Sequence, residues 1–201
     1  MSDGLVAGRF RLRGLLGSGG TAAVFAADDT QAGGSVALKL LHPHLATERR
    51  AWDAFFEEVR AAQSISHPGL VEVRDAGIVD ADPPVVWIAM ELVEGVSLDE
   101  HVRAAGPLTP AAAVAVCDAV LAALEAAHAG GVVHRDVSPS NISLDPALLS
   151  EPLDAERLAA SVRLLDFGLA DIPGRSTVGA DALLSGAGAT AAELASESPT
   201  R

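Results

Sequence analysis

Two polar segments of the sequence carry side chains of types suited to catalysis or metal binding. HRDVSPSN, residues 134–141, places Asp136 five positions before Asn141. It lies between two short apolar runs, and a loop between strand ends is a usual location for catalytic residues. DFG, residues 166–168, follows an apolar run and offers the carboxylate of Asp166, which suits an oxygen-preferring ion such as Mg²⁺. Taken alone, each segment is also explained as a polar turn.

Two further segments suit a phosphate-bearing ligand. LGSGGTAAVF, residues 16–25, contains glycines whose lack of a Cβ atom lets backbone N–H groups approach phosphate oxygens. These glycines are Gly17, Gly19 and Gly20. VALK, residues 36–39, ends on Lys39, which is the candidate cation for Glu58 because a buried carboxylate needs one. A ligand-free glycine hairpin, a lysine reaching solvent and a glutamate on an exposed face are the alternatives.

The elements that position these residues in the first half of the chain are mostly strands. Short apolar runs separated by turn residues predict strands, the first three in an antiparallel sheet, at residues 10–16, 23–27, 35–41, 70–73 and 85–90. Apolar residues recur at spacings of three and four over residues 48–65, which predicts one amphipathic helix. Glu94 and Gly95 mark a change to a helical pattern, so a lobe boundary is expected there.

The second half of the chain is predicted to be mainly helical. Ser97 with Glu100 forms a capping-box pattern for a short helix, and Thr109 with Pro110 begins a longer one. The buried face expected for the longer helix is Cys117, Val120, Leu121, Leu124 and His128. Short strands are expected at residues 132–133, 142–144 and 162–165, with a surface excursion over 145–160 and a mostly disordered tail over 173–201.

Composition limits the kinds of partner and compartment. A formal net charge of −13 argues against a nucleic-acid surface, and 49% hydrophobic residues suffice for a real core. The longest apolar run, residues 111–128, is interrupted by Asp118 and Glu125, so no membrane span is expected. The single cysteine, Cys117, is expected to be a buried small hydrophobe, which fits a reducing cytoplasm.

Taken together and in order, the glycine-rich loop, VALK, the helix glutamate, HRDVSPSN and DFG resemble the protein kinase superfamily. The LGSGG opening, His67 with Pro68, and MELVEG from Met90 are similar to bacterial serine/threonine kinases of the eukaryotic type. The resemblance covers residues 9 to 172. It implies an α+β fold of two lobes, an antiparallel N-lobe over 9–93 and a partial, mainly helical C-lobe over 94–172.

The resemblance also implies ATP and Mg²⁺ as ligands and a protein Ser or Thr hydroxyl as phosphate acceptor. The implied ATP-binding residues are Leu16, Gly17, Ser18, Gly19, Gly20, Val24, Ala37, Lys39, Met90, Glu91 and Val93. In the family's pattern Lys39 holds the α and β phosphates while Glu58 orients it, and Asp136 accepts or orients the substrate hydroxyl proton. Asn141 and Asp166 are the implied Mg²⁺ ligands.

The sequence departs from the family pattern at several places. Ala22 occupies the third glycine position, Ser143 stands where an apolar floor for adenine is usual, and Ser138 replaces a lysine that contacts the transferred phosphate. No APE motif follows residues 166–168, so the second lobe is expected to be incomplete. A catalytically silent nucleotide-binding or scaffold module is therefore the alternative to an active kinase. A small-molecule phosphotransferase of kinase-like fold is a more distant one.

Overall fold

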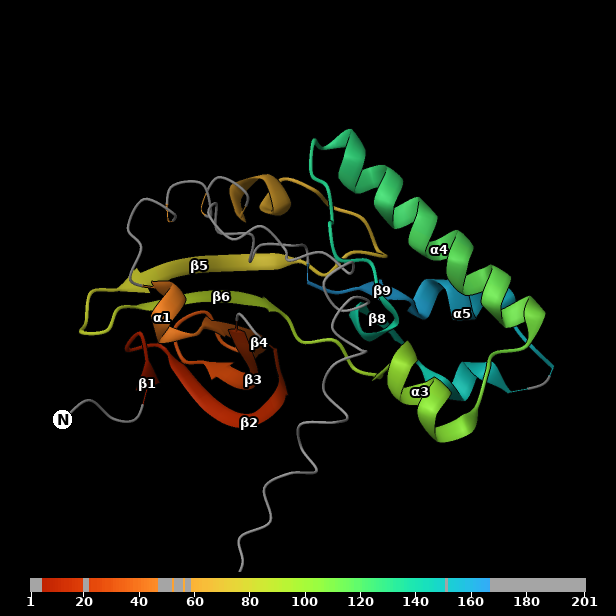
Figure 1. Cartoon of the computed structure of the whole chain (residues 1–201), viewed down its shortest axis with the longest axis horizontal. Helices are drawn as coiled ribbons and strands as arrows, with labels where there is room; N and C mark the ends of the chain where they lie inside the picture. Colours follow the sequence, from red (N-terminus) through yellow and green to blue (C-terminus); the bar gives the residue numbers. More distant parts are fainter. Residues whose placement is uncertain are drawn as a thin grey trace, which may run out of the picture.

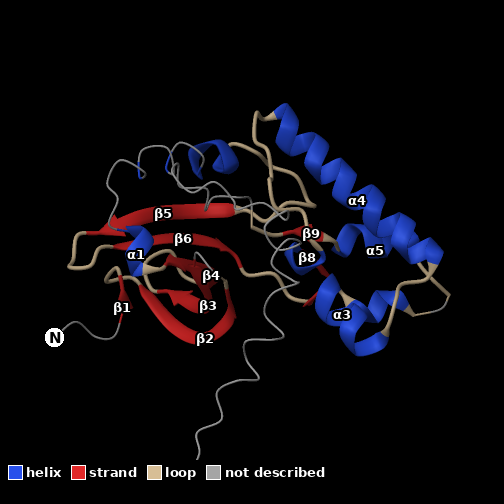
Figure 2. Cartoon of the chain, in the orientation of Figure 1, coloured by secondary structure: helices blue, strands red, loops and turns tan. Residues whose placement is uncertain are grey.

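The computed structural model of the chain has a sheet-rich lobe and a mainly helical lobe (Figure 1). It describes residues 5–19, 22–46, 52, 56, 59–150 and 152–166. In Figure 2, the strands gather in the first lobe, while the long helices belong to the second. This arrangement confirms the predicted α+β fold of an antiparallel first lobe followed by a mainly helical second lobe.

The first lobe is built on a six-stranded antiparallel sheet in the order β1-β2-β3-β4-β6-β5. The strands are β1 (Leu5–Val6), β2 (Phe10–Ser18), β3 (Ala22–Asp29), β4 (Ser35–Leu41), β5 (Val73–Val79) and β6 (Val85–Glu91). Four of the five predicted strands are present close to their predicted positions. The strand predicted at 70–73 was placed too early, because Leu70 makes only an isolated bridge and regular pairing begins at Val73.

The sheet is apolar on both faces, which follows from the alternation of side chains along a strand. On β4, Val36 and Leu38 pack into one cluster with Phe10 and Trp87, whose rings meet edge to face at 4.8 Å. Ala37 and Leu41 face the larger core, shared with the second lobe. The helix predicted over 48–65 is represented by the described residues 52, 56 and 59–63, all of them helical. The short helix α1 (Pro43–Ala46) precedes it.

The second lobe surrounds a small three-stranded sheet in the order β7-β8-β9. Its elements are β7 (Val96–Ser97), α3 (Leu98–Ala105), α4 (Pro110–Ala129), η1 (Pro139–Asn141), β8 (Ile142–Leu144), η2 (Pro146–Leu149), α5 (Ala155–Ser161) and β9 (Arg163–Leu164). The predicted capping box is present, since the Glu100 amide donates to the Ser97 hydroxyl and the Ser97 amide donates to the Glu100 carboxylate. The strand predicted at 132–133 is absent, because this segment has no strand pairing.

Backbone pairing joins the two lobes directly. The Leu164 amide donates to the Gly69 carbonyl at 2.7 Å, and the Val71 amide donates to the Leu164 carbonyl at 3.2 Å. These bonds form a parallel bridge between Leu70 and Leu164. The segment that leads into Asp166 is therefore held against the first lobe as well as the second.

The buried face of α4 matches the prediction only in part, at buried Val120 and half-buried Leu124. Cys117, Leu121 and His128 are exposed. The buried residues are mostly alanines: Ala112, Ala115, Val116, Val120, Ala123 and Ala127. Small side chains face the core because other segments come very close; a Cβ added to Gly69 would lie 3.1 Å from that of Ala123. An alanine-rich helix carries little contrast between its faces, which is why hydrophobic periodicity misplaced three of the five residues.

The segment 145–160 lies largely at the surface, as expected, but it is ordered into helices and contributes Leu158 to the core. It folds into η2 and α5, and α5 packs against α4. Leu158 has no exposed surface, and Asp154 caps the helix by accepting from the Arg157 amide at 3.1 Å. The prediction of a disordered tail over 173–201 lies outside the described residues.

By length and composition, α4 is the one described helix that could cross a membrane, with 20 residues and a mean hydropathy of 1.7. Core helices pass the same test, so this is weak support for a membrane span. Six α4 residues are buried in the core described above. The absence of a membrane span stays a prediction.

Candidate active site

The segment HRDVSPSN folds into a loop in which Asn141 holds Asp136. The Asn141 amide nitrogen Nδ2 donates to the Asp136 backbone carbonyl and to its carboxylate oxygen Oδ2, each at 2.9 Å. The 3₁₀ turn η1 brings Asn141 back toward Asp136, with the Asn141 backbone amide donating to the Ser138 carbonyl at 2.9 Å. Because both partners of Nδ2 are acceptors only, the amide oxygen Oδ1 is directed away from Asp136. The loop thus presents a fixed carboxylate with an amide oxygen beside it.

Buried His134 connects this loop to the segment before Asp166. Its Nε2 donates to the Leu165 carbonyl at 2.7 Å, and the Asp136 amide lies 3.3 Å from its Nδ1, which accepts. The Leu165 amide in turn donates to the Asn141 carbonyl at 2.7 Å. Burial lowers the pKa of His134, which favours the neutral ring that this pattern requires. Both backbone groups of Leu165 are bonded to the loop of residues 134–141, so that loop helps to set the position of Asp166.

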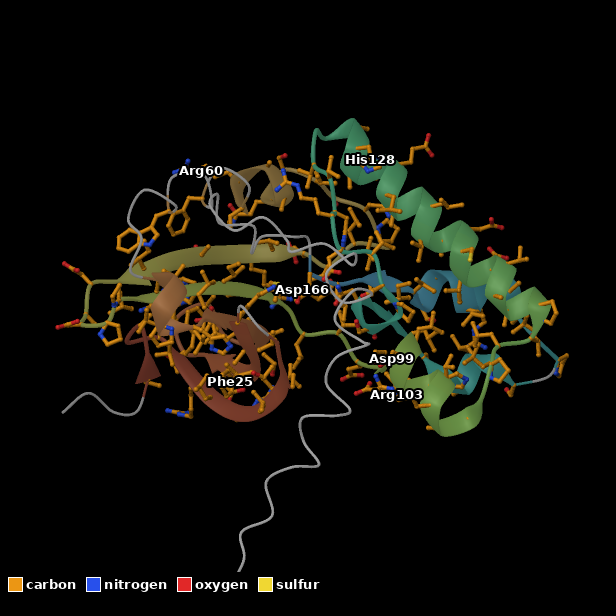
Figure 3. All side chains as sticks on the ribbon, in the orientation of Figure 1. Phe25, Arg60, Asp99, Arg103, His128 and Asp166 are labelled. Carbon is orange, nitrogen blue, oxygen red and sulfur yellow. The ribbon has the colours of Figure 1, made fainter. Side chains whose placement is uncertain are left out.

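Lys39 and Asp166 form an ion pair between the lobes. Lys39 Nζ donates to Asp166 Oδ1 at 2.7 Å, and the lysine is only 5% exposed. Figure 3 places Asp166 between the sheet and the helical lobe. A buried ammonium needs a counter-charge, and Asp166 supplies it in this structure. The predicted partner Glu58 lies outside the described residues, so its pairing with Lys39 stays a prediction.

Two residues of the site have left-handed backbone conformations that are uncommon for residues with a Cβ atom. Arg135 has a φ of 63° and Asp166 a φ of 49°. Such conformations cost about 1 kcal/mol or more each and persist where the surrounding structure imposes them. The hydrogen bonds of Leu165 hold the backbone that precedes Asp166, and the ion pair to Lys39 holds its side chain. The backbone strain therefore lies next to Asp136 and at Asp166, an implied Mg²⁺ ligand.

The glycine-rich segment is a hairpin that continues the sheet beside Lys39. β2 and β3 pair with Gly17 opposite Val24, and β4 pairs with β3 so that Val24 lies opposite Lys39. The implied nucleotide-binding residues on β2 are exposed: Leu16, Gly17 and Ser18. Gly19 is exposed at the end of the strand, and Gly20 lies outside the described residues. The register therefore brings the glycine-rich strand and the lysine to one end of the sheet.

The remaining implied nucleotide contacts lie where the sheet passes into the second lobe. Ala37 is paired with Met90, and both are buried in the larger core. Glu91 ends β6, and its amide donates to the Glu72 carbonyl at 2.9 Å. Val93 is half-buried in the connection to β7. Cross-strand pairing brings Ala37 and Met90 together, as the resemblance implied, while the contacts of adenine itself stay predicted.

The substituted positions also belong to the site. The hydroxyls of Ser138 and Ser140 lie 2.9 Å apart, and either can donate. Ser143 is buried on β8, on the face opposite its core neighbours Ile142 and Leu144. A Cβ added to Gly95 would lie 3.0 Å from the Ser143 hydroxyl and 2.6 Å from the Leu144 carbonyl, so the close approach of these segments requires glycine.

Sequence reasoning missed the part played by the backbone of Leu165 and Gly69. Both bind through main-chain atoms, which every residue possesses, so no sequence signal marks them. It also assigned no role to His42, whose ring contacts the glycine-rich hairpin. The proline that follows His42 was a weak signal of a fixed position.

Comparison with known proteins places this site in a family. The protein kinase domain profile matches residues 10–185, and the chain belongs to the protein kinase family. Probable serine/threonine-protein kinase PknB of Corynebacterium glutamicum is 37% identical over 174 residues, covering 86% of this chain and 25% of that protein. Serine/threonine-protein kinase PrkC of Bacillus subtilis is 31% identical over 173 residues, covering 86% of this chain and 24% of that protein. The chain thus spans about a quarter of these curated relatives.

Solved structures give the same family. The Mycobacterium tuberculosis PknI kinase domain matches with a TM-score of 0.62 and 28% identity, covering 85% of this chain and 63% of that one. A fragment of Rad53 in complex with AMP-PNP matches with a TM-score of 0.63 and 26% identity, covering 81% of this chain and 39% of that one. The two-lobed kinase fold predicted from the motifs is confirmed by these matches.

Proposed function

We propose that this chain contains the nucleotide-binding and catalytic-loop portion of a serine/threonine protein kinase that acts in the cytoplasm. The reaction is transfer of the γ-phosphoryl group of ATP to a protein Ser or Thr hydroxyl. The observation that carries the proposal is one bonded network: Asp136 to Asn141, Asn141 to Leu165, and Asp166 to Lys39. Family membership, relatives named as serine/threonine kinases and the AMP-PNP complex of Rad53 support it.

The use of lysine in this chain supports a nucleotide-binding role for position 39. The sequence has 14 Lys and Arg residues, and Lys39 is the single lysine. Every other Lys or Arg position holds arginine, so lysine occurs only at the position where the motif requires it. Lysine is a compact charge on a flexible stem, whereas the planar guanidinium is wider and bonds as a fork. At this nearly fully buried position, the smaller ammonium group leaves room for both Asp166 and a phosphate to contact the same cation.

Asp136 is the proposed acceptor or orienting group for the substrate hydroxyl proton. Its carboxylate is on an exposed residue, so a substrate hydroxyl can reach it. The bond from Asn141 Nδ2 to Oδ2 fixes the carboxylate and leaves Oδ1 for the hydroxyl. Positioning of this kind contributes to phosphoryl transfer mainly by holding the reacting groups in line.

The residues present fit Mg²⁺ ligation. Asn141 directs its amide oxygen away from Asp136, and the Asp166 side chain, which is paired with Lys39, is 32% exposed. Carboxylate and amide oxygens are the ligands that Mg²⁺ prefers. Asn141 and Asp166 are therefore the residues that would hold it, where it would neutralise charge on the transferred phosphoryl group.

The test compares Asp136→Asn with a matched control, Asp118→Asn, which makes the same change at an exposed position on α4. Phosphate incorporation into the chain and into a generic protein substrate is measured with Mg-ATP, together with the thermal shift caused by Mg-AMP-PNP. We expect Asp136→Asn to lose at least about 100-fold in incorporation, with its folding and thermal shift retained. Equal incorporation by Asp136→Asn and the wild-type chain would contradict the proposal. A thermal shift without turnover by the wild-type chain would favour the silent module instead.

A further inference from the structure

The side chain of His42 is bonded to the glycine-rich hairpin. Its Nε2 lies 2.9 Å from the backbone carbonyl oxygen of Gly19. A carbonyl oxygen only accepts hydrogen bonds, so Nε2 carries the proton and the ring is the donor. The bond therefore exists with either the neutral Nε2–H ring or the doubly protonated ring.

His42 lies between two elements of the first lobe. It directly follows β4, and it is the last residue before α1. Pro43 confines the backbone of the preceding residue to extended conformations, and the His42 carbonyl accepts from the Ala46 amide at 3.3 Å. Ala46 is fully buried, and its own carbonyl accepts from the Trp52 indole at 3.2 Å. The backbone that carries the imidazole is thus held by β4 before it and by α1 after it.

The hairpin has few other contacts to fix it. β2 is exposed along its length from Arg11, and a Cβ added at Gly17 or at Gly19 would meet nothing within 4 Å. The Gly19 amide donates to the Ala22 carbonyl at 2.9 Å, which closes the hairpin on itself. This bond joins the end of β2 to β3, so β2 is linked to the rest of the sheet here only through β3 in the described residues.

The bond from His42 reaches across one strand. Ala22 begins β3 and lies opposite Leu41, the last residue of β4, while Gly19 follows the end of β2. His42 therefore links the end of β4 to the end of β2, past the start of β3. Hydrogen bonds at the end of a hairpin open first, and a link to a third strand restricts that opening.

We propose that His42 is a positioning residue for the glycine-rich loop, which it tethers through the Gly19 carbonyl in a conformation ready to cover the phosphates of ATP. The tether itself is a property of the free chain. The effect of the tether on ATP binding rests on the proposed function. Ordering backbone before the ligand arrives removes part of the entropy cost of binding, so the tether raises affinity for the nucleotide. Lys39 and Asp166 are untouched, so the rate at saturating ATP depends on it less.

The test uses three substitutions in the full chain. His42→Phe retains a ring but removes the donor, His42→Gln retains a donor, and His128→Phe makes the same change at an exposed position on α4 (Figure 3). Hydrogen–deuterium exchange of residues 16–24 is measured without nucleotide. Binding of Mg-ATP is measured by fluorescence titration with a labelled analogue, and KM and kcat are measured where there is turnover.

We expect His42→Phe to speed exchange over residues 16–24 about three- to tenfold, which is the range that one hydrogen bond supports, with exchange in β5 and β6 unchanged. The KM for ATP should rise by a similar factor and kcat should change less than twofold. His42→Gln should recover most of the loss, and His128→Phe should match the wild-type chain. Unchanged exchange in His42→Phe overturns the tether, and unchanged affinity for Mg-ATP overturns its role in binding. If the wild-type chain binds no nucleotide, the proposed function fails, and the exchange comparison still decides the tether.

Discussion

Lys39 Nζ lies 2.7 Å from Asp166 Oδ1, although the two residues are 127 positions apart in the chain. The pair joins β4 of the first lobe to the segment that follows β9 of the second. Asp166 is the counter-charge beside the buried Lys39, and the same carboxylate is a proposed ligand of Mg²⁺. One contact therefore connects the relative position of the lobes to the predicted chemistry.

Lys39→Arg is expected to lower phosphate transfer about 10- to 150-fold while the chain stays folded. The guanidinium retains the charge but does not fit the buried position beside Asp166, and the loss of one charge-assisted hydrogen bond corresponds to about 1.5 to 3 kcal/mol. Turnover and Mg-ATP binding are measured. The control is Arg74→Lys, the reverse exchange at a largely exposed cation. Full activity in Lys39→Arg would show that position 39 does not contact the nucleotide.

Ser138→Lys is expected to raise the rate of phosphate transfer by up to about 10- to 150-fold. A lysine at this position would add a charge-assisted hydrogen bond to the transferred phosphate that a serine hydroxyl does not provide. The measurement is kcat with saturating Mg-ATP. Ser140→Lys is the matched control, because the Ser140 hydroxyl lies 2.9 Å from that of Ser138 but at a position that the family's motif does not assign to phosphate. A rate gain in both variants would indicate a general electrostatic effect.

Stability is expected to fall with pH below about 6.5 because of His134. Burial lowers the pKa of His134 from its ordinary value of 6.5. As pH falls through 6.5, the unfolded chain takes up a proton that the folded chain does not, so the free energy of unfolding decreases until the lower folded pKa is reached. Melting temperatures at pH 7.5 and 5.5 measure this effect. His134→Gln should show a smaller difference between the two pH values, and the exposed His128→Gln should match the wild-type chain; equal pH dependence in all three would contradict the assignment.

Asp29→Asn is expected to cost about 1.5 to 3 kcal/mol of unfolding free energy. The buried Asp29 carboxylate accepts from Arg9 at 2.8 and 2.6 Å and from two backbone amides of its own turn at 3.0 Å. The Arg9 guanidinium holds the pKa of Asp29 well below its usual range, so the charged form is the one that stabilises the fold. Urea unfolding gives the value. Asp28→Asn, whose 40% exposed side chain pairs with Arg13, should cost less than about 1 kcal/mol.

Leu158→Ala is expected to destabilise the chain by about 2 to 5 kcal/mol, because a fully buried leucine is removed. This value measures what the single buried residue described in the mostly exposed segment 145–160 contributes to the core. Leu121→Ala, on the exposed side of α4, is the control and should change the unfolding free energy by less than about 0.5 kcal/mol. Similar values for the two variants would mean that α5 does not belong to the core. Urea unfolding of both variants provides the measurement.

Local signals predicted most of the regular elements. β4 and β8 have the predicted bounds, because each is a short apolar run between turn residues. α3 begins at its capping box, and α4 begins with a threonine cap and a first-turn proline. The errors arose where the local pattern carried little contrast. The alanines of α4 look alike on every face, and the leucines of residues 145–160 gave no indication of the helix that they would pack against.

The sequence by itself determined which residues belong to the site, since the types and order of the glycine-rich loop, Lys39, Asp136, Asn141 and Asp166 are properties of the chain. Only the tertiary structure decided which of them touch. Lys39 meets Asp166, His134 bonds to the Leu165 carbonyl and His42 bonds to the Gly19 carbonyl. The physical reason is that these contacts join side chains to distant charges and to main-chain atoms. Strand register and the docking of the two lobes set those distances, and main-chain acceptors leave no mark on the sequence.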